Sequence, residues 1–212
     1  MVSAILWDND GVLVDTERLY YQATRQVLER VGVDLTVDAY RQLFLTEARG
    51  AWHLAAERGV GPQEIDRLRT LRNDTYRDLL LTSDVPIPGA LALVKLLEPR
   101  YRMAIVTSSH REHFDAVHHR TGLRDLVEFV ITPEDYTHYK PHPEPYLRAL
   151  ERLSLAAAEC VAIEDSERGL ASAKAAGIRC YIVHSDLTAG CTFEGAERCF
   201  ANLAEVGEFL LT

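Results

Sequence analysis

Five short apolar runs, each ending in polar residues, alternate with segments of helical periodicity along most of this chain. The runs are VSAILW (2–7), MAIVTSS (103–109), LVEFVIT (126–132), CVAIED (160–165) and RCYIVH (179–184). Helical patterns cover roughly 89–98, 111–121, 143–153, 167–176 and 202–211. Buried strands that alternate with helices are typical of a parallel sheet with helices on both faces. The pattern therefore predicts a Rossmann-like α/β fold.

The stretch from 17 to 81 breaks this alternation, because it carries helical patterns and almost no strand pattern. Apolar residues recur at near-helical spacing at Leu19, Ala23, Val27 and Val31, before a stop at Gly32. Further helices are predicted near 36–44, 50–58 and 62–81. The prolines of VPIPGA (85–90) then return the chain to the α/β pattern. We expect an α/β core at 1–16 and 83–212 with an inserted all-helical cap domain at 17–82.

Charge and hydropathy narrow the range of partners. The formal net charge of −9 argues against nucleic acid or an anionic membrane as the main partner, but leaves room for a local cationic pocket. No apolar stretch approaches the roughly 20 residues that span a bilayer, and the acidic start is unlike a signal peptide. The four cysteines form no CxxC pair. These features predict a cytoplasmic protein without disulfides, membrane contact or bound nucleic acid.

Polar residues gather where the predicted strands end, the edge at which parallel sheets bind ligands. The first run leads into Asp8, Asn9, Asp10 and Gly11, and side chains two apart in an extended segment point the same way. The second run ends in Thr107, Ser108 and Ser109, and the fourth ends in Glu164 and Asp165 before Ser166. Lys140 lies in the proline-rich loop YKPHPEPY (139–146). Four acids, one cation and several hydroxyls are therefore expected at one edge.

This combination suits phosphoryl transfer. A hard divalent cation makes clustered carboxylates tolerable, and Mg²⁺ prefers oxygen ligands. The transferred phosphate needs positive charge and hydrogen-bond donors, which Lys140, Thr107 and backbone amides can supply. One carboxylate can attack phosphorus while a protonated neighbour donates to the leaving oxygen.

Four ordered motifs resemble the haloacid dehalogenase (HAD) superfamily. They are DNDGVLVDT (8–16), VTSS (106–109), KPHPEPY (140–146) and EDSERGLASAKAAG (164–177). The resemblance covers most of the chain outside 17–81, and the insertion matches the place of the helical cap in that superfamily. It implies a Mg²⁺-dependent phosphatase (a phosphoric monoester hydrolase) that acts on a small phosphorylated metabolite through an aspartyl-phosphate. The second aspartate of the first motif favours phosphate over carbon–halogen substrates.

The resemblance also implies roles for the residues of the first two motifs. Asp8 resembles the nucleophile, and Asp10 the general acid that afterwards acts as base. Thr107, with Ser108 and the backbone that follows, resembles the phosphate grip.

The later motifs supply the cation and the metal ligands. Lys140 resembles the residue that links nucleophile and phosphate. Glu164 and Asp165 resemble Mg²⁺ ligands, together with Asp8 and the Asp10 carbonyl. For Glu164, a supporting position behind the metal is the alternative.

Several other residues have an interpretation of their own. Asp15 is expected to be structural, where the chain leaves the core. Arg49 either reaches into the cleft to hold a second anionic group of the substrate or is a surface arginine, and Tyr20 can line the cleft. His118 and His119 are expected at the surface of a helix without a metal.

Two further functions remain as alternatives to a phosphatase. A β-phosphoglucomutase-like phosphosugar mutase shares every core motif, but such mutases usually carry a histidine where this chain has Tyr20. A non-catalytic binding protein would be marked by loss of Asp8 or Asp10, and both are present. The substrate stays open, and the chain is expected to be a monomer or a weak homodimer.

Overall fold

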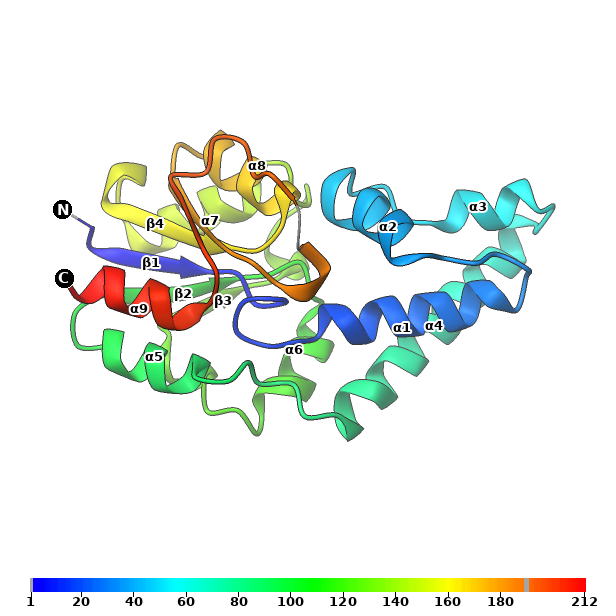
Figure 1. The fold of residues 1–212 in the computed structure, drawn as a ribbon, viewed down its shortest axis with the longest axis horizontal. Helices are drawn as coiled ribbons and strands as arrows, with labels where there is room; N and C mark the ends of the chain where they lie inside the picture. The colour runs from blue at the N-terminus through cyan, green and yellow to red at the C-terminus, as the bar shows by residue number, and fades with distance from the viewer. Residues whose placement is uncertain (1, 189–190) are drawn as a thin grey trace.

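A six-stranded parallel sheet forms the centre of one half of the molecule (Figure 1). The computed structural model describes residues 2–188 and 191–212. The strand order is β3-β2-β1-β4-β5-β6, so β1 lies between β2 and β4. The strands are β1 (Ala4–Trp7), β2 (Arg102–Val106), β3 (Phe129–Ile131), β4 (Cys160–Glu164), β5 (Arg179–Val183) and β6 (Arg198–Phe200).

The side chains of β1 show how helices cover both faces of this sheet. Ile5 and Trp7 point into one apolar cluster, and Ala4 and Leu6 point into another on the opposite face. The first cluster packs under α5 (Ala90–Leu97), α6 (Arg111–His118) and α9 (Leu203–Leu211). The second packs under α7 (Glu144–Leu153) and α8 (Glu167–Ala175). The predicted Rossmann-like α/β fold is confirmed.

The ends of the elements differ from the prediction in places. The sixth strand was missed because its three residues, Arg-Cys-Phe, form a short and partly exposed edge without an apolar run. Of the third predicted strand only Phe129–Ile131 joins the sheet, since a 3₁₀ turn at Arg124–Leu126 overlaps its start. Further 3₁₀ turns cover Pro133–Asp135, Ala157–Glu159 and Asp186–Thr188.

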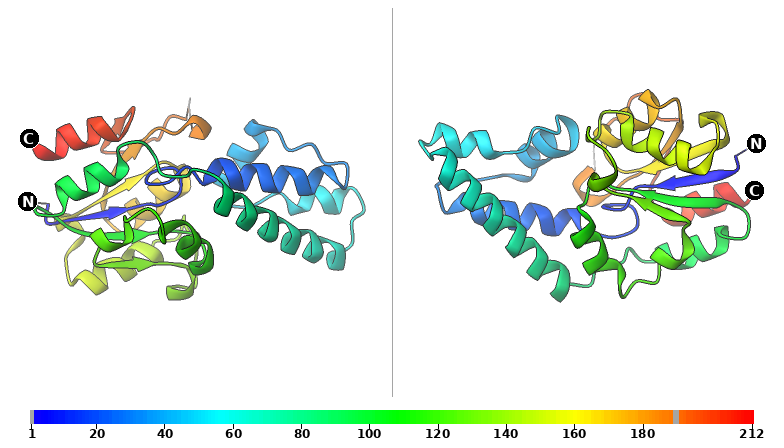
Figure 2. Two further views of the ribbon diagram at one scale, coloured as in Figure 1. Left: turned by 90° about the horizontal axis from the view of Figure 1, so that it is seen from below. Right: turned by 180° about the vertical axis from the view of Figure 1, so that it is seen from behind.

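A group of helices stands beside the sheet and follows β1 in the sequence (Figures 1 and 2). It comprises α1 (Glu17–Glu29), α2 (Val37–Tyr40), the π-helical turn η1 (Arg41–Thr46), α3 (Trp52–Glu57) and α4 (Pro62–Thr82). We call this group the helical insertion. Its outer part has an apolar cluster of its own, built around Leu28, Leu35, Tyr40 and Leu45. Within the described residues, no helix is both long and apolar enough to cross a membrane.

The two linkers that join the insertion to the sheet run side by side. Val14 and Pro86 form an antiparallel bridge. The Asp15 amide donates to the Val85 carbonyl at 2.7 Å, and the Ile87 amide donates to the Leu13 carbonyl at 3.1 Å. The Asp15 carboxylate accepts from Arg18 at 2.9 Å at the surface, so Asp15 is structural, as expected.

The ends of α1 and α4 nearest the sheet belong to the main apolar cluster rather than to the insertion's own. Leu19 and Ala23 from α1 join Tyr76 and Leu80 from α4 in the cluster that also holds Phe114 of α6. The insertion is therefore packed onto the core as well as tethered to it.

This packing predicts different costs for two adjacent leucines. Leu80 is fully buried, whereas Leu81 is 49% exposed. Leu80→Ala should lower the free energy of unfolding by about 2 to 5 kcal/mol, because it leaves a cavity in the main cluster. Leu81→Ala, the matched control, should change it by less than about 0.5 kcal/mol. Urea denaturation measures both, and equal effects would contradict this account of the packing.

Candidate active site

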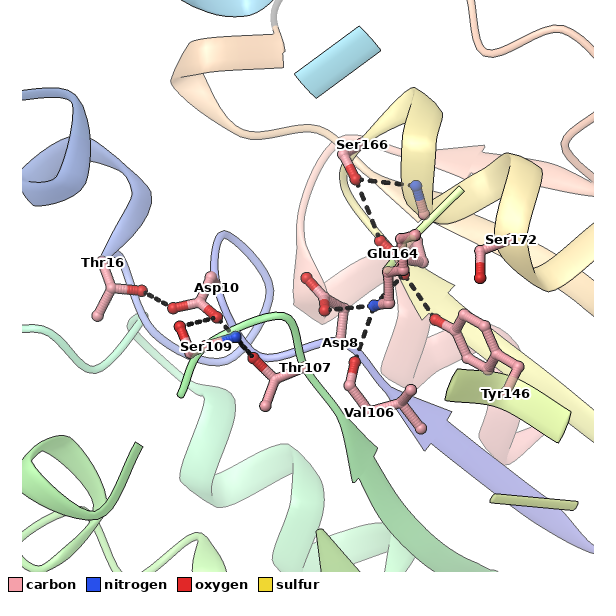
Figure 3. A network of polar contacts seen from close by, with 12 residues as sticks. Asp8, Asp10, Thr16, Val106, Thr107, Ser109, Tyr146, Glu164, Ser166 and Ser172 are labelled. Atoms are coloured by element: carbon pink, nitrogen blue, oxygen red, sulfur yellow. Dashed lines mark hydrogen bonds and ion pairs between the residues drawn. The ribbon is translucent and has the colours of Figure 1, made fainter. Parts of the chain in front are cut away.

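The predicted site residues from three strands meet at one edge of the sheet. Trp7 at the end of β1 is in register with Ile105 of β2 and with Ile163 of β4. The residues that follow these positions therefore emerge together. Figure 3 shows Asp8, Asp10, Thr107 and Glu164 close to one another at this edge.

Lys140 is the centre of the buried part of the site. It is 2% exposed, and its Nζ donates to Asp8 Oδ1 at 2.7 Å and to Glu164 Oε1 at 2.6 Å. A third bond goes to the Val106 carbonyl at 2.8 Å, so all three ammonium protons have acceptors (Figure 3). The Tyr146 hydroxyl also donates to Glu164 Oε1, at 2.6 Å. These contacts fix Asp8 and Glu164 on either side of one cation.

Burial changes the protonation of these groups. Desolvation, reinforced by the nearby Glu164 carboxylate, raises the pKa of Asp8 to about 8, although Lys140 opposes the shift. Desolvation and then Asp8 raise the pKa of Asp165 well above its usual value. Burial alone would lower the pKa of Lys140, but Asp8 and Glu164 raise it above its usual value. The ammonium thus stays charged, but one cation is too few for three buried carboxylates, so Asp8 and Asp165 give up their protons less readily than ordinary carboxyl groups.

The carboxylate set fits a hard divalent cation. Asp8, Glu164 and Asp165 each offer an oxygen, and these oxygens lie within 4.8 Å of one another. Glycines make room for them: a Cβ at Gly11 would lie 2.0 Å from Asp165 Oδ2, and one at Gly169 would lie 1.9 Å from Glu164 Oε2. Mg²⁺ prefers a set made of oxygen ligands alone, and a divalent cation would compensate the charge of these carboxylates as they lose their protons. A role for the Asp10 carbonyl as a further ligand stays a prediction.

Asp10 belongs to a second network, which faces the insertion. Its Oδ1 accepts from the Thr16 hydroxyl at 2.5 Å. Its Oδ2 accepts from the hydroxyls of Thr107 at 2.8 Å and Ser109 at 2.9 Å. Strand alternation alone would place Asp10 beside Asp8, but β1 ends at Trp7 and the two carboxylates take different partners (Figure 3). The site therefore has one aspartate tied to a cation and one tied to hydroxyls.

A cavity of about 330 Å³ lies between the insertion and these strand ends. Asp10 and Ser108 line it from the sheet, and Tyr20 and Arg49 line it from the insertion. Arg49 is exposed and also lines this cavity, so both of its alternatives stay open. The hydroxyl of Ser108 is buried and has no hydrogen-bond partner within the described residues.

Sequence reasoning missed two arginines of this cavity, Arg72 and Arg168. Arg72 lies on α4 and is only 9% exposed, with its guanidinium 4.4 Å from the ring centre of Tyr20 and 5.6 Å from that of Trp52. Its Nη1 donates to the Tyr20 hydroxyl at 2.5 Å and its Nε to Asn73 at 2.9 Å. Arg168, at the start of α8, has a buried Nε with no hydrogen-bond partner among the described residues. Arg72 lies outside the four motifs, whereas Arg168 lies within EDSERGLASAKAAG (164–177) but was given no role there.

The expectation that His118 lies at the surface was wrong. The ring is buried, and its Nε2 and Nδ1 pair with the Asn9 amide oxygen and the Thr121 hydroxyl, each at 2.8 Å. His118 therefore fixes the side chain of Asn9, the residue between Asp8 and Asp10. Helix α6 turns this position inward, toward a residue more than 100 positions earlier in the chain, which no local pattern indicates.

Comparison with known proteins identifies the family of this chain. The family model for haloacid dehalogenase-like hydrolases matches residues 2–177. The chain belongs to this family. Among haloacid dehalogenase-like relatives, the CbbY protein of Rhodobacter capsulatus is 33% identical over 208 residues, covering 92% of this chain and 91% of the relative. The phosphorylated carbohydrates phosphatase of Thermotoga maritima is 32% identical over 190 residues, with 87% of each chain covered.

The solved structures show the same fold within this hydrolase family. A mutant CbbY from Rhodobacter sphaeroides, in complex with xylulose-(1,5)bisphosphate, superposes with a TM-score of 0.81. Its sequence is 26% identical, and the match covers 98% of this chain and 97% of that one. The expected membership of the haloacid dehalogenase superfamily is thereby confirmed.

The buried histidine generates a prediction for stability against pH. Desolvation lowers the pKa of His118 to about 4, against about 6.5 in the unfolded chain. Between these two pH values His118 binds a proton in the unfolded state but not in the folded state. The free energy of unfolding therefore falls as the pH drops through this window. The loss should reach about 3 kcal/mol below pH 4.

His118→Gln should remove that part of the pH dependence, measured as the free energy of unfolding at pH 7 and at pH 4.5. The control is His119→Gln, because the neighbouring His119 ring is exposed and contacts the Ala116 carbonyl. The same pH slope in His118→Gln and in the unmodified chain would rule out this role for His118.

Proposed function

We propose that this chain is a Mg²⁺-dependent phosphatase that hydrolyses the phosphoric monoester of a small phosphorylated metabolite through an aspartyl-phosphate on Asp8. The observation that carries the proposal is the Asp8 carboxylate, held by Lys140 inside a carboxylate cluster that fits a divalent cation. Named phosphatases among the relatives, such as the one from Thermotoga maritima, support it. The enzyme would be cytoplasmic and act as a monomer or weak homodimer.

The first step uses both aspartates. Asp8 Oδ1 is held by Lys140, which leaves Oδ2 to attack phosphorus. The new O–P bond forms as the bond to the leaving oxygen breaks, and Asp10 gives its proton to that oxygen. Asp10 suits this role because Thr16, Thr107 and Ser109 hold its carboxyl group toward the cavity.

The second step reverses the role of Asp10. Its carboxylate takes a proton from water, the water oxygen attacks phosphorus, and the bond from phosphorus to Asp8 breaks. Lys140 keeps a positive charge beside Asp8 in both steps. Asp8, Glu164 and Asp165 would hold Mg²⁺, which when bound neutralises charge on the phosphoryl oxygens. We assign residues 1–16 and 83–212 to the catalytic core, and residues 17–82 to a cap that excludes water.

The cap side of the cavity supports a substrate with a second anionic group, on a sugar phosphate scaffold. Arg72 is buried between two aromatic rings, and no carboxylate among the described residues forms a salt bridge with it. A buried guanidinium without an acid partner is costly, and a phosphate or carboxylate can satisfy it with two parallel hydrogen bonds. Arg49 lines the same wall. A CbbY structure that contains a bisphosphate is consistent with this proposal.

The environment of Tyr20 counts against the mutase alternative. Desolvation raises the pKa of this phenol above its usual value, and its oxygen already accepts a hydrogen bond from Arg72. A phenol in this state cannot exchange protons near neutral pH as a histidine does. We therefore expect hydrolysis rather than conversion of β-glucose 1-phosphate to glucose 6-phosphate, and efficient conversion would favour the mutase.

Loss of the proposed nucleophile should abolish turnover. We expect Mg²⁺-dependent hydrolysis of p-nitrophenyl phosphate, and a loss of at least about 10⁴-fold in kcat for Asp8→Asn. Asp15→Asn is the matched control, because this half-exposed aspartate follows the same strand but pairs with Arg18, and it should keep activity. A panel of phosphate esters with and without Mg²⁺ identifies the substrate. Undiminished activity in Asp8→Asn would refute the mechanism.

Arg72 should affect substrates with a second anionic group selectively. We expect Arg72→Met to raise KM for a sugar bisphosphate at least about tenfold, the loss of one charge-assisted contact. The kinetics of p-nitrophenyl phosphate, which has no second anion, should change little. Arg69→Met serves as the control, because Arg69 lies on the same helix but pairs with Asp66 near the surface. Equal losses on both substrates would count against an anion subsite at Arg72.

A further inference from the structure

The loop that carries Lys140 inward also carries a cluster of metal-binding side chains on its outer side. His138, His142 and Glu144 offer ligand atoms that all lie within 4.8 Å of one another. His138 and His142 are exposed and Glu144 is partly exposed, in contrast to the buried set of Asp8, Glu164 and Asp165. The mechanism proposed above uses none of these three side chains.

Contacts around the cluster hold it in place. The His138 ring donates from Nδ1 to Glu144 Oε2 at 2.8 Å, and its backbone amide donates to the same oxygen at 2.9 Å. The Glu144 amide donates to His142 Nδ1 at 3.2 Å. The two imidazole rings lie 4.5 Å apart between centroids, at 32° to each other.

The backbone of the loop is fixed as well. The His142 amide donates to the Tyr139 carbonyl at 2.9 Å, and the Ser172 hydroxyl of α8 donates to the His142 carbonyl at 2.7 Å. Lys140, between the two histidines, is anchored in the buried network. The three ligands therefore sit on a short segment whose shape is set before any ion arrives, which lowers the entropic cost of binding.

The donor set differs in kind from the catalytic one. Two imidazoles with one carboxylate suit Zn²⁺ and other first-row transition metals, whereas Mg²⁺ prefers oxygen alone. Hydrogen bonds from the ring and backbone of His138 lower the pKa of Glu144 to about 2, so this carboxylate is ionised near neutral pH. The exposure of the cluster leaves room for water as a fourth ligand.

We propose that His138, His142 and Glu144 form a surface site for Zn²⁺ or a similar transition-metal ion, separate from the catalytic carboxylates. An ion that binds His138 Nδ1 displaces the proton that this nitrogen donates to Glu144 Oε2; a neutral ring then carries its proton on Nε2, and only an imidazolium releases one to solvent. The hydrogen bond from the Glu144 backbone amide to His142 Nδ1 competes with the ion for that nitrogen, so the affinity of the site for the ion is modest. An ion there would clamp both ends of the segment around Lys140.

Equilibrium dialysis of the full chain against ZnCl₂, in excess Mg²⁺ to occupy the catalytic carboxylates, tests the site. We expect about one Zn²⁺ per chain above what His138→Gln/His142→Gln binds, and each single variant should weaken binding at least about 100-fold. His119→Gln is the control, because His119 is an exposed histidine just after α6, outside the loop of the cluster. Zn²⁺ should also raise the melting temperature of the unmodified chain and of His119→Gln, but not of the double variant.

The outcomes separate clearly. If the double variant binds as much Zn²⁺ as the unmodified chain, the ion lies elsewhere and the proposal is wrong. If the unmodified chain binds none and its melting temperature is unmoved, the cluster serves only to cap α7. Circular dichroism of the double variant without metal checks that it is folded, and neither readout depends on phosphatase activity.

Discussion

One buried ammonium group, that of Lys140, holds together the parts of this molecule that must act as a unit. It donates to Asp8, which directly follows β1, to Glu164 at the end of β4 and to the last carbonyl of β2, so each of its protons has an acceptor. Removing one partner of a buried ion pair costs about 3 to 5 kcal/mol, because the other charge is left uncompensated. The carboxylates are therefore bound to one arrangement, and two glycines allow them to be packed this closely.

The two sides of the cavity are built on different principles. The sheet side is rigid: strand register places the carboxylates, and hydroxyls from two segments hold Asp10. On the insertion side, the guanidinium of Arg72 packs against the aromatic rings of Tyr20 and Trp52. This division suits an enzyme in which the core supplies the chemistry and the insertion selects the substrate, since the selecting residues can vary without disturbing the strand ends.

The sequence was informative where local pattern and topology decide the outcome. Apolar runs located five strands, and the rule that ligands bind at the ends of parallel strands brought Asp8, Thr107 and Glu164 together. The sequence pattern did not predict which side chains pair, because Lys140 and Asp8 are 132 positions apart and nothing local indicates that they touch. Arg72 and His118 were missed for the same reason: each lies on an ordinary amphipathic helix, and only packing turns it toward the site. The edge strand β6 is too short and too polar for its pattern to be recognised.

The paired linkers at 13–15 and 85–87 have a consequence for how the chain can vary. Ile5 lies beside Met103 although the whole insertion separates them in the sequence, so forming the sheet requires closing that long loop. The entropic cost of closure grows only logarithmically, by about 0.6 kcal/mol for each doubling of loop length. The chain enters the insertion through α1 and leaves it through α4, and the near ends of these two helices pack onto the core beside the linkers (Figure 2). The length and structure of the outer part of the insertion can therefore change at little cost to the sheet, provided that the linkers still meet and the near ends of α1 and α4 keep their packing.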